Sequence, residues 1–485
     1  MFASVITSSI HRNRVKRKIS VMLWFLCVLA YICVSNVSAQ VAEKKQTSSV
    51  RARYEERERE LLKQIEKRPA DAKLYNELGV NQFYLGKGAA AETSFLKAIQ
   101  LDAKNADARA NLSFHYYQTG KQEAAADLLR EALALDPNNF LANHYSGLLY
   151  FARKQPVRAE IFLKKALSLQ PSNLDVQLDL IKVQAANGQI AEAELELDRL
   201  ATAQPSEARV RYARAAFYAS QGRNLDALSE YKTVLTIAPE STGVLFEMAI
   251  IHFRVRQYYD AIRLLQEFHK TGASIESAYL LGHAFAETGQ LDEAEMWLRR
   301  SLEGREDYFD TRFQLGRLLF TLRKYADAIE HLRRAAALQE TNIESRYLLG
   351  FCLELTNDID GAMTEYQEIL RIAPQRFEGY HGAGSVLLKR GDTTKALTNL
   401  SRAAQLNPRE PDVRYLLGRA LARAGNNSGA IDHLKIAVDL DPRRVDARFQ
   451  LATALRKAGR NEEADEQFKI VEQLNNEFRN RQKNP

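Results

Sequence analysis

The hexapeptide RYLLGR at residues 414–419 occurs almost unchanged elsewhere in the chain, as RYLLGF at residues 346–351 and RFQLGR at residues 312–317. The first residues of these copies are separated by 34 and 68 positions, so a period of 34 residues runs through this part of the sequence. Periods of about 20 to 50 residues are typical of repeat proteins, in which each repeat is one small supersecondary unit. The extent of this period therefore decides the fold.

The period extends over most of the chain. When Leu78 and Gly79 are taken as the seventh and eighth positions of a unit, the spacing can be followed from residue 72 to residue 478, with one unit a residue short. The twentieth position of every unit is alanine, from Ala91 to Ala464. Twelve units result, at residues 72–105, 106–139, 140–173, 174–207, 208–241, 242–274, 275–308, 309–342, 343–376, 377–410, 411–444 and 445–478.

Each unit reads as two helices joined by a turn, because its apolar residues recur at helical spacing in both halves. Position 15 is glycine in eight units, where a left-handed residue would end the first helix. Small residues at positions 8 and 20 predict that the two helices approach closely. Proline at position 32 in seven units predicts the end of the second helix. Such a unit cannot bury its apolar face alone, so the units are expected to stack into a solenoid.

A helix-turn-helix unit of 34 residues with Leu-Gly at positions 7 and 8, Ala at 20 and Pro at 32 resembles the tetratricopeptide repeat family. The resemblance covers residues 72–478 and implies an all-α fold, a right-handed α-solenoid superhelix. One departure has no explanation in the sequence: position 4, often aromatic in the family, is arginine in six units. These residues are Arg109, Arg211, Arg312, Arg346, Arg414 and Arg448.

Residues 1–39 are expected to form an export signal. Five basic residues between Arg12 and Lys18 precede the apolar run VMLWFLCVLAYICV at residues 21–34, and Val37-Ser38-Ala39 follow as a small-residue cleavage site. The apolar run is shorter than the roughly 20 residues of a membrane-spanning helix. We expect cleavage before Gln40 and a periplasmic or otherwise extracytoplasmic protein; the alternative is an inner-membrane anchor at residues 21–39.

The remaining segments flank the repeats. Residues 40–71 are expected to contain a linker, at residues 41–52, and a helix at 54–70 that caps the first unit. Residues 479–485 are expected to be a polar tail.

Composition excludes several functions. The net charge of +7 falls to +2 for residues 40–485, because residues 1–39 hold five basic and no acidic residues, so nucleic-acid binding is not expected. Nearly every residue after the signal belongs to the repeats, which leaves no catalytic domain, and no C-x-x-C, H-E-x-x-H or phosphate-binding glycine motif is present. We therefore predict no enzyme, no metal and no cofactor.

His331 and His433 recur at position 23 and are expected to be solvated, whereas Cys352 is expected to be buried.

The resemblance implies that positions 2, 5, 6, 9, 12 and 13 of the first helices line a concave surface that binds peptides of partner proteins. Aromatic residues recur at position 5, either as ligand anchors or as core. Inner positions of the first three units are apolar and aromatic, and those of the last units are basic, including Lys389 and Lys457. The candidate surface comprises Phe83, Phe114, Tyr117, Phe151, Tyr212, Phe246, Tyr279, Phe313, Tyr347, Tyr415, Arg419, Arg423, Phe449 and Arg456.

The sequence thus predicts an exported, non-enzymatic scaffold or adaptor that binds a protein or peptide in its concave groove, in envelope assembly or export. The alternative is a carbohydrate-binding solenoid, since a ladder of Tyr and Phe can stack on the sugar rings of a polysaccharide. Contact with a membrane is expected only through the N-terminal segment.

Overall fold

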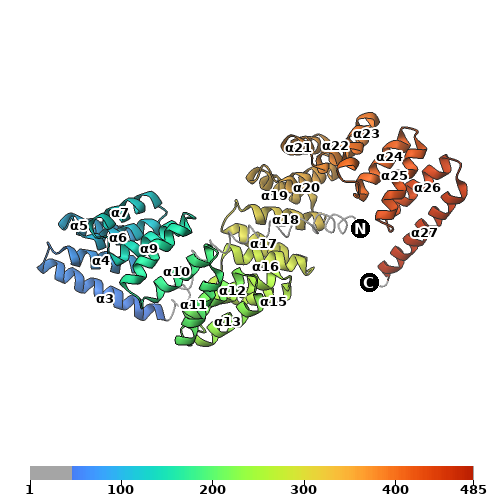
Figure 1. Cartoon of the computed structure of the whole chain (residues 1–485). Coiled ribbons are helices and arrows are strands. Elements are labelled where there is room, and N and C mark those ends of the chain that lie inside the picture. Colours follow the sequence, from blue (N-terminus) through green and yellow to red (C-terminus); the bar gives the residue numbers. More distant parts are fainter. Residues whose placement is uncertain (1–45, 484–485) are drawn as a thin grey trace. The chain divides into compact units, whose positions relative to one another are not determined.

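The computed structural model describes residues 46–483, and every regular element in that range is an α-helix (Figure 1). The chain divides after Ala273 into two compact parts. We call residues 46–273 the N-terminal half and residues 274–483 the C-terminal half.

The described helices have the following bounds. The N-terminal half contains α3 (Gln46–Lys67), α4 (Ala72–Tyr84), α5 (Gly88–Leu101), α6 (Ala106–Gln118), α7 (Gln122–Leu135), α8 (Phe140–Ala152), α9 (Pro156–Leu169), α10 (Leu174–Ala186), α11 (Ile190–Ala203), α12 (Ala208–Ser220), α13 (Asn224–Ile237), α14 (Gly243–Arg254) and α15 (Tyr258–Gly272). The C-terminal half contains α16 (Ile275–Glu287), α17 (Leu291–Glu303), α18 (Phe309–Thr321), α19 (Tyr325–Leu338), α20 (Ile343–Leu355), α21 (Ile359–Ile372), α22 (Phe377–Arg390), α23 (Thr393–Leu406), α24 (Pro411–Arg423), α25 (Asn427–Leu440), α26 (Val445–Lys457) and α27 (Asn461–Lys483).

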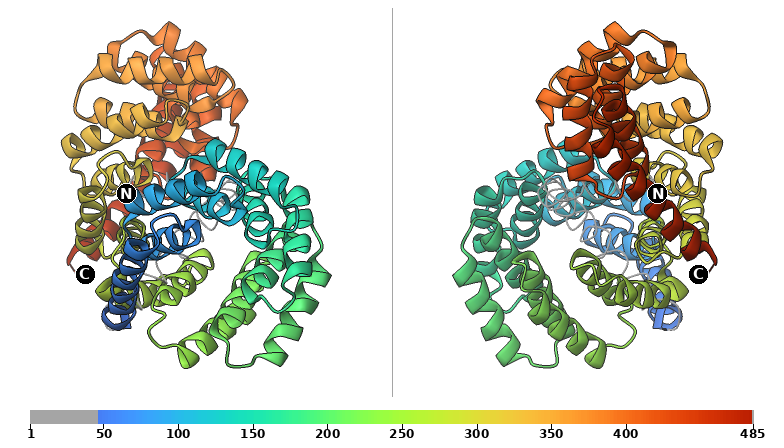
Figure 2. Two further views of the ribbon diagram at one scale, coloured as in Figure 1. Left: turned by 90° about the vertical axis from the view of Figure 1, so that its left-hand side faces the viewer. Right: turned by 90° about the vertical axis from the view of Figure 1, so that its right-hand side faces the viewer.

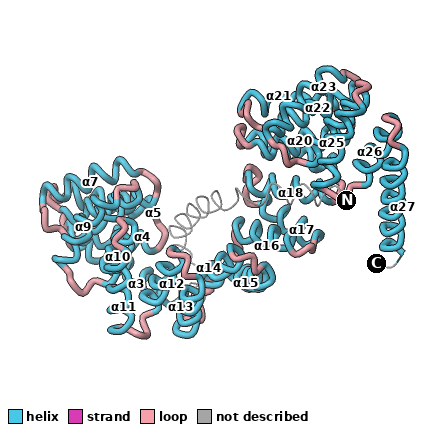
Figure 3. The backbone as a smooth tube through the Cα atoms, turned by 45° about the vertical axis from the view of Figure 1, so that its right-hand side comes forward, coloured by secondary structure: helices cyan, strands magenta, loops and turns pink. Residues whose placement is uncertain are grey.

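From α4 onward, even-numbered helices are the first helices of the units and odd-numbered helices are the second. Within each half, a second helix packs on the first helix of its own unit and on the first helix of the next (Figure 3). First helices of neighbouring units also pack on one another, so they form an inner layer and the second helices an outer layer (Figure 2). The all-α solenoid predicted from the sequence is confirmed.

The turn between the two helices of each unit has the predicted left-handed residue at position 15. Eight of these residues are glycines, such as Gly391 with φ +87°. The other four are Lys154, Arg256, Arg323 and Asn357, with φ between 59° and 65°. Residues other than glycine are strained at positive φ. At these four positions the geometry of the turn therefore imposes a conformation that the residue itself disfavours.

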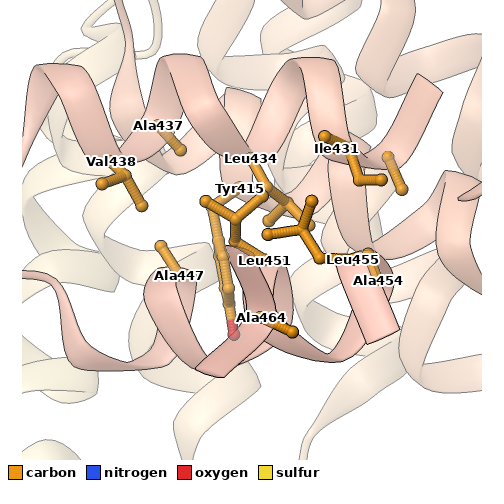
Figure 4. Close-up of a cluster of buried hydrophobic side chains, with 11 residues drawn as sticks. Tyr415, Ile431, Leu434, Ala437, Val438, Ala447, Leu451, Ala454, Leu455 and Ala464 are labelled. Carbon is orange, nitrogen blue, oxygen red and sulfur yellow. The ribbon is translucent and has the colours of Figure 1, made fainter. Parts of the chain in front are cut away.

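Close approach of the paired helices explains the small residues at positions 8 and 20. A Cβ atom on Gly418 would lie 2.6 Å from Cγ of Leu434, and Ala430 is completely buried. Figure 4 shows Leu434 among the apolar side chains of α25 and α26 that make up one such core, with Tyr415 of α24 reaching into it.

Both flanking segments are more helical than predicted. The helix α3 begins at Gln46, inside the expected linker, and its Leu61 packs on Leu74 and Leu78. The last helix continues to Lys483 through most of the expected polar tail, because no glycine or proline interrupts it. The predicted export signal at residues 1–39 lies outside the described residues.

The recurring arginine at position 4 joins neighbouring units. Nε of Arg346 donates to the carbonyl of Glu340 at 3.0 Å, and Nη1 pairs with Glu365 of α21 at 2.9 Å. We call this arrangement the arginine clamp. Four more units contain it, formed by Arg211 with Pro205 and Glu230, Arg312 with Glu306 and His331, Arg414 with Pro408 and His433, and Arg448 with Pro442 and Gln467.

Three further units make a different contact from position 4. Asn143 and Gln177 at position 4 donate to the carbonyls of Pro137 and Pro171, whereas Arg109 pairs with Glu131. The expectation of solvated histidines was wrong for His331, which is 6% exposed because it serves as a clamp acceptor. Burial and the charge of Arg312 lower the pKa of His331, which keeps the imidazole neutral and able to accept.

Candidate functional site

The first three units carry a row of aromatic side chains on their first helices. The rings of Phe114 in α6 and Tyr145 in α8 stack with their centroids 4.5 Å apart, and Phe83 of α4 packs on Phe114 at 5.6 Å. Beside Phe83, Tyr84 stacks on Tyr54 of α3 at 5.4 Å. We call Tyr54, Phe83, Tyr84, Phe114, Tyr117 and Tyr145 the aromatic row.

The aromatic row combines fixed rings with an exposed surface. Phe83, Phe114 and Tyr117 are half-buried, and Tyr84 is 62% exposed. Burial raises the pKa of Tyr145 to about 12, with a smaller contribution from Tyr84, so its hydroxyl stays protonated at neutral pH. The row therefore offers apolar area with neutral polar tips, at little conformational cost on binding.

Charged groups border the aromatic row at the fourth unit. Nζ of Lys182 in α10 lies 5.0 Å from the ring centroid of Phe151, and burial lowers the pKa of Lys182 to about 8 against the opposing charge of Asp179. Asp179 Oδ2 lies 2.8 Å from Nε2 of His144. This border thus holds an ammonium group over an aromatic face with a carboxylate close by.

The position-5 aromatics are divided between core and surface. Tyr279 and Tyr415 are each 8% exposed, whereas Phe449 is 49% exposed. Tyr212, Tyr347 and Phe449 pack on rings in the second helices of their own units, Tyr231, Tyr366 and Phe468, with centroids 5.6, 6.0 and 5.7 Å apart. Phe246 and Phe313 are half-buried and pack on Phe268 and Phe309. Some members of this column thus belong to the core, and others remain exposed.

The basic end predicted for the last units is largely paired within the chain. Arg423 donates to the carbonyl of Leu388 at 2.8 Å, Arg456 pairs with Asp465, and Lys389 pairs with Glu354 at 3.0 Å. Arg419 is exposed, with its guanidinium 5.4 Å from the ring centroid of Tyr415. These cations are therefore less available to a ligand than the sequence indicated.

Known families support the repeat architecture. Two family models described as tetratricopeptide repeat match the chain, one at residues 76–140, 116–173, 381–444 and 424–471 and the other at 150–217 and 319–383. Together they cover more than half of it. The chain belongs to the tetratricopeptide repeat family. A third model, described as anaphase-promoting complex, cyclosome, subunit 3, matches residues 267–335 of this tetratricopeptide repeat protein.

Solved structures resemble the protein at low identity. Yeast Tom70 is 17% identical, with 83% of this chain and 92% of that chain covered and a TM-score of 0.36. The APC/C hetero-tetramer Cut9-Hcn1 is 13% identical, with 90% and 95% covered and a TM-score of 0.47. A tetratricopeptide repeat protein from Parabacteroides merdae is 21% identical, with 51% and 98% covered and a TM-score of 0.42. No curated protein sequence matches the chain.

Tyr54, Asp179 and Lys182 of the site were not predicted from the sequence. Tyr54 precedes the repeats, so its stacking on Tyr84 cannot be read from a repeat position. Lys182 occupies inner position 9. A charged residue among the apolar neighbours of that position was the signal that could have identified it. In this repeat protein, residues 46–483 contain no helix long and apolar enough to cross a membrane and no cluster of His, Cys, Asp and Glu that could hold a metal ion.

Proposed function

We propose that the protein is an exported, non-enzymatic scaffold that binds an apolar segment of a partner protein along the aromatic row. The observation that carries this proposal is the row itself, in which stacked, half-buried rings lead to the 62% exposed ring of Tyr84. Rigid aromatic side chains lose little entropy on binding and dominate the energetics of many protein interfaces.

The border of the aromatic row gives the bound segment a direction. Lys182 and Asp179 lie at the fourth unit, beyond the apolar surface of the first three. An apolar segment with a polar or charged end matches this order, because its apolar side chains meet the rings and its charged end meets these side chains. Contacts over several units then add up to useful affinity.

A protein segment fits the row better than a polysaccharide does. Sugars stack on exposed ring faces, but Phe114 and Tyr145 turn their faces to each other, with 19° between the ring planes. Ring edges and side-chain grooves remain for a ligand, and these suit apolar protein side chains. Carbohydrate binding is therefore the competing outcome of the experiment below.

Photo-crosslinking tests the proposal directly. A benzophenone amino acid replaces Tyr84 in one variant and, as a matched control, Leu225 of the second helix α13, which is 84% exposed. In native cells, we expect the same few partner proteins to be linked to position 84 in repeated experiments and not to position 225, and Phe114→Ala to reduce the yield at least fivefold. Equal yields at both positions, or capture of a glycan, would contradict the proposal.

The exported location is part of the same proposal and rests on residues 1–39. The mass of the protein purified from its native cells tests it separately: we expect a mature chain that begins at Gln40. A chain that begins at Met1 and stays in the soluble cytosolic fraction would contradict export without affecting the binding proposal.

A further inference from the structure

Unit junctions repeat a polar bridge between positions 34 and 2. At one junction, Nδ2 of Asn139 at position 34 donates to Asp107 at position 2 of the same unit, 2.6 Å away. In the C-terminal half Arg444, also at position 34, pairs with Asp412 at position 2 of its own unit and with Asp446 at position 2 of the next unit, at 2.9 Å. At these junctions a donor at position 34 binds one or two carboxylates at position 2; at the junction after Glu207 the roles are exchanged, and Arg209 at position 2 pairs with Glu207 and Asp175.

The junction before Asp412 breaks this pattern. Its position 34 is Glu410, so a carboxylate stands where Arg444 stands one unit later and where Arg376 stands one unit earlier. Arg376 pairs with Glu378 at position 2, as the pattern requires. At the junction between these two arginines, Glu378, Glu410 and Asp412 are three successive acids in the bridge positions. We call them the acidic junction.

Two acids of the acidic junction are buried, and one of these, Glu410, has no cation of its own in the described chain, whereas Glu378 pairs with Arg376 and Asp412 with Arg444. Glu378 is 6% exposed and Glu410 is 8% exposed. Within residues 46–483, Glu410 forms no ion pair; the positive charge of Arg444 reaches it only at longer range, and the backbone N–H of Asp412 helps to stabilise its carboxylate. Burying a carboxylate without a partner cation is costly.

A second buried group at the junction, the imidazole of His381, has one atom without a partner among the described residues. His381 of α22 is 7% exposed, and its Nε2 has no hydrogen-bond partner in the described part of the chain. Its Nδ1 lies 2.7 Å from the hydroxyl of Tyr347. His381 is the position-5 residue of the unit that ends at Glu410; in the next unit the position-5 ring of Tyr415 lies 4.2 Å from the guanidinium of Arg444 at position 34, so the imidazole stands beside the bridge position. When Nδ1 carries the proton, Nε2 is free to accept a hydrogen bond from an incoming N–H group.

We propose that the acidic junction binds the guanidinium group of an arginine from a partner protein, with Glu410 and Asp412 as the carboxylates and Nε2 of His381 as a further acceptor. The incoming group takes the bridge position that Arg444 occupies at the next junction. A ligand would reach the site at Asp412, since the side chain of this residue is 21% exposed.

Chemistry favours guanidinium over ammonium at this place. A guanidinium group is planar, has five N–H donors and is weakly hydrated, so it can bridge two carboxylates and leave water at lower cost than an ammonium group. Arg444 shows that this chain accommodates such a bridge, because it pairs with two acids while its guanidinium lies 4.2 Å from the ring centroid of Tyr415.

The test uses small probes on the full-length protein. Saturation-transfer difference NMR measures binding of N-acetyl-arginine amide, with N-acetyl-citrulline amide as the neutral isostere and N-acetyl-lysine amide as the ammonium probe. Glu410→Arg supplies the missing guanidinium from within the chain, and helix α24 does not need the Glu410 side chain as a cap. Glu330→Arg makes the same change of charge at an exposed position of α19, where Glu330 forms no ion pair with any other described residue.

We expect a saturable signal from the arginine probe, at least fivefold above that of the citrulline and lysine probes. Glu410→Arg should abolish it, Glu410→Gln should weaken it several-fold, and Glu330→Arg should leave it unchanged. Circular dichroism confirms that each variant is folded. Equal signals from arginine and citrulline, from arginine and lysine, or from the parent protein and folded Glu410→Arg would overturn the proposal.

Discussion

The guanidinium of Arg346 and the carboxylate of Glu365 form an ion pair at 2.9 Å in which the side chains are only 12% and 19% exposed. The same arginine also binds the carbonyl of Glu340, which is position 32 of the preceding unit. One side chain therefore connects both helices of its own unit with the end of the unit before it.

Removal of this clamp should loosen its unit. We expect Arg346→Ala to lower the free energy of opening of α20 and α21 by about 2 kcal/mol, because a partly buried, charge-assisted pair is lost and Glu365 is left alone. Hydrogen exchange of the amides in both helices measures this effect. Arg333→Ala, an exposed arginine of α19, is the control and should change it by less than about 0.5 kcal/mol. A loss no larger than in the control would show that the clamp does not stabilise the unit.

Position 15 allows opposite changes at equivalent sites. Arg323→Gly should stabilise the C-terminal half by roughly 0.5 to 1 kcal/mol, because it relieves a side chain held at φ 60°. Gly391→Ala, at the same position two units later, should destabilise it by roughly 1 kcal/mol. Urea denaturation followed by circular dichroism measures both changes. Shifts of the same sign would contradict the strain argument.

Stability should fall as the pH rises toward neutrality. Burial, followed by the charge of Asp412, raises the pKa of Glu410 from 4.5 to about 7, with Glu378 adding to the shift and Arg444 opposing it. Between these two values the folded protein keeps a proton that the unfolded chain has lost, so stability decreases with pH across that window and levels off above about pH 7.

The variant Glu410→Gln isolates this effect. It should remove a pH-dependent change on the order of 3 kcal/mol and make the C-terminal half more stable than the parent at pH 8, as measured by urea denaturation at several pH values. Burial also raises the pKa of Glu247 in the N-terminal half to about 7, so Glu247→Gln should act in the same direction there. An unchanged slope in Glu410→Gln would mean that Glu410 is ionised in the folded state throughout.

The thiol of Cys352 should report the opening of its unit. This side chain is fully buried in α20, and burial raises its pKa to about 12. We expect maleimide to modify it at least a hundredfold more slowly than a Ser220→Cys control at an exposed position, and Arg346→Ala to accelerate the reaction. Mass spectrometry of the peptide that contains Cys352 measures the rate. Rapid labelling of the parent protein would contradict its burial.

The sequence was informative where one physical requirement recurs in every unit. Gly418 lies against Leu434, and Gly391 ends a helix in the left-handed region. Glycine recurs at both of these repeat positions in other units, so the close approach and the turn could be predicted. The arginine clamp leaves a weaker signal in the sequence. Its five acceptors at position 23, such as Glu365 and His433, are polar, but position 23 is also polar at Glu196, in a unit without arginine at position 4. The sequence pattern alone therefore does not identify the pairing.

The candidate site was less predictable, because exposure depends on the neighbours of a residue as well as on its repeat position. Tyr415 and Phe449 share position 5, yet α26 covers Tyr415, whereas Phe449 belongs to the last unit and has no following first helix above it. Tyr54 lies outside the repeats altogether. Such differences between equivalent positions belong to tertiary structure and leave no periodic trace.

The clamps also have a mechanical consequence. Donors at position 4 bind the carbonyl at position 32 of the preceding unit in three runs of successive units, whereas Leu245 and Tyr380 provide no such bond. Since each bond joins a unit to the one before it, the runs connect residues 106–241, 275–376 and 377–478. In a linear array, the interfaces between neighbours carry any load applied to the ends. A protein pulled by its termini would therefore lengthen in blocks of three or four repeats, each block yielding as one piece.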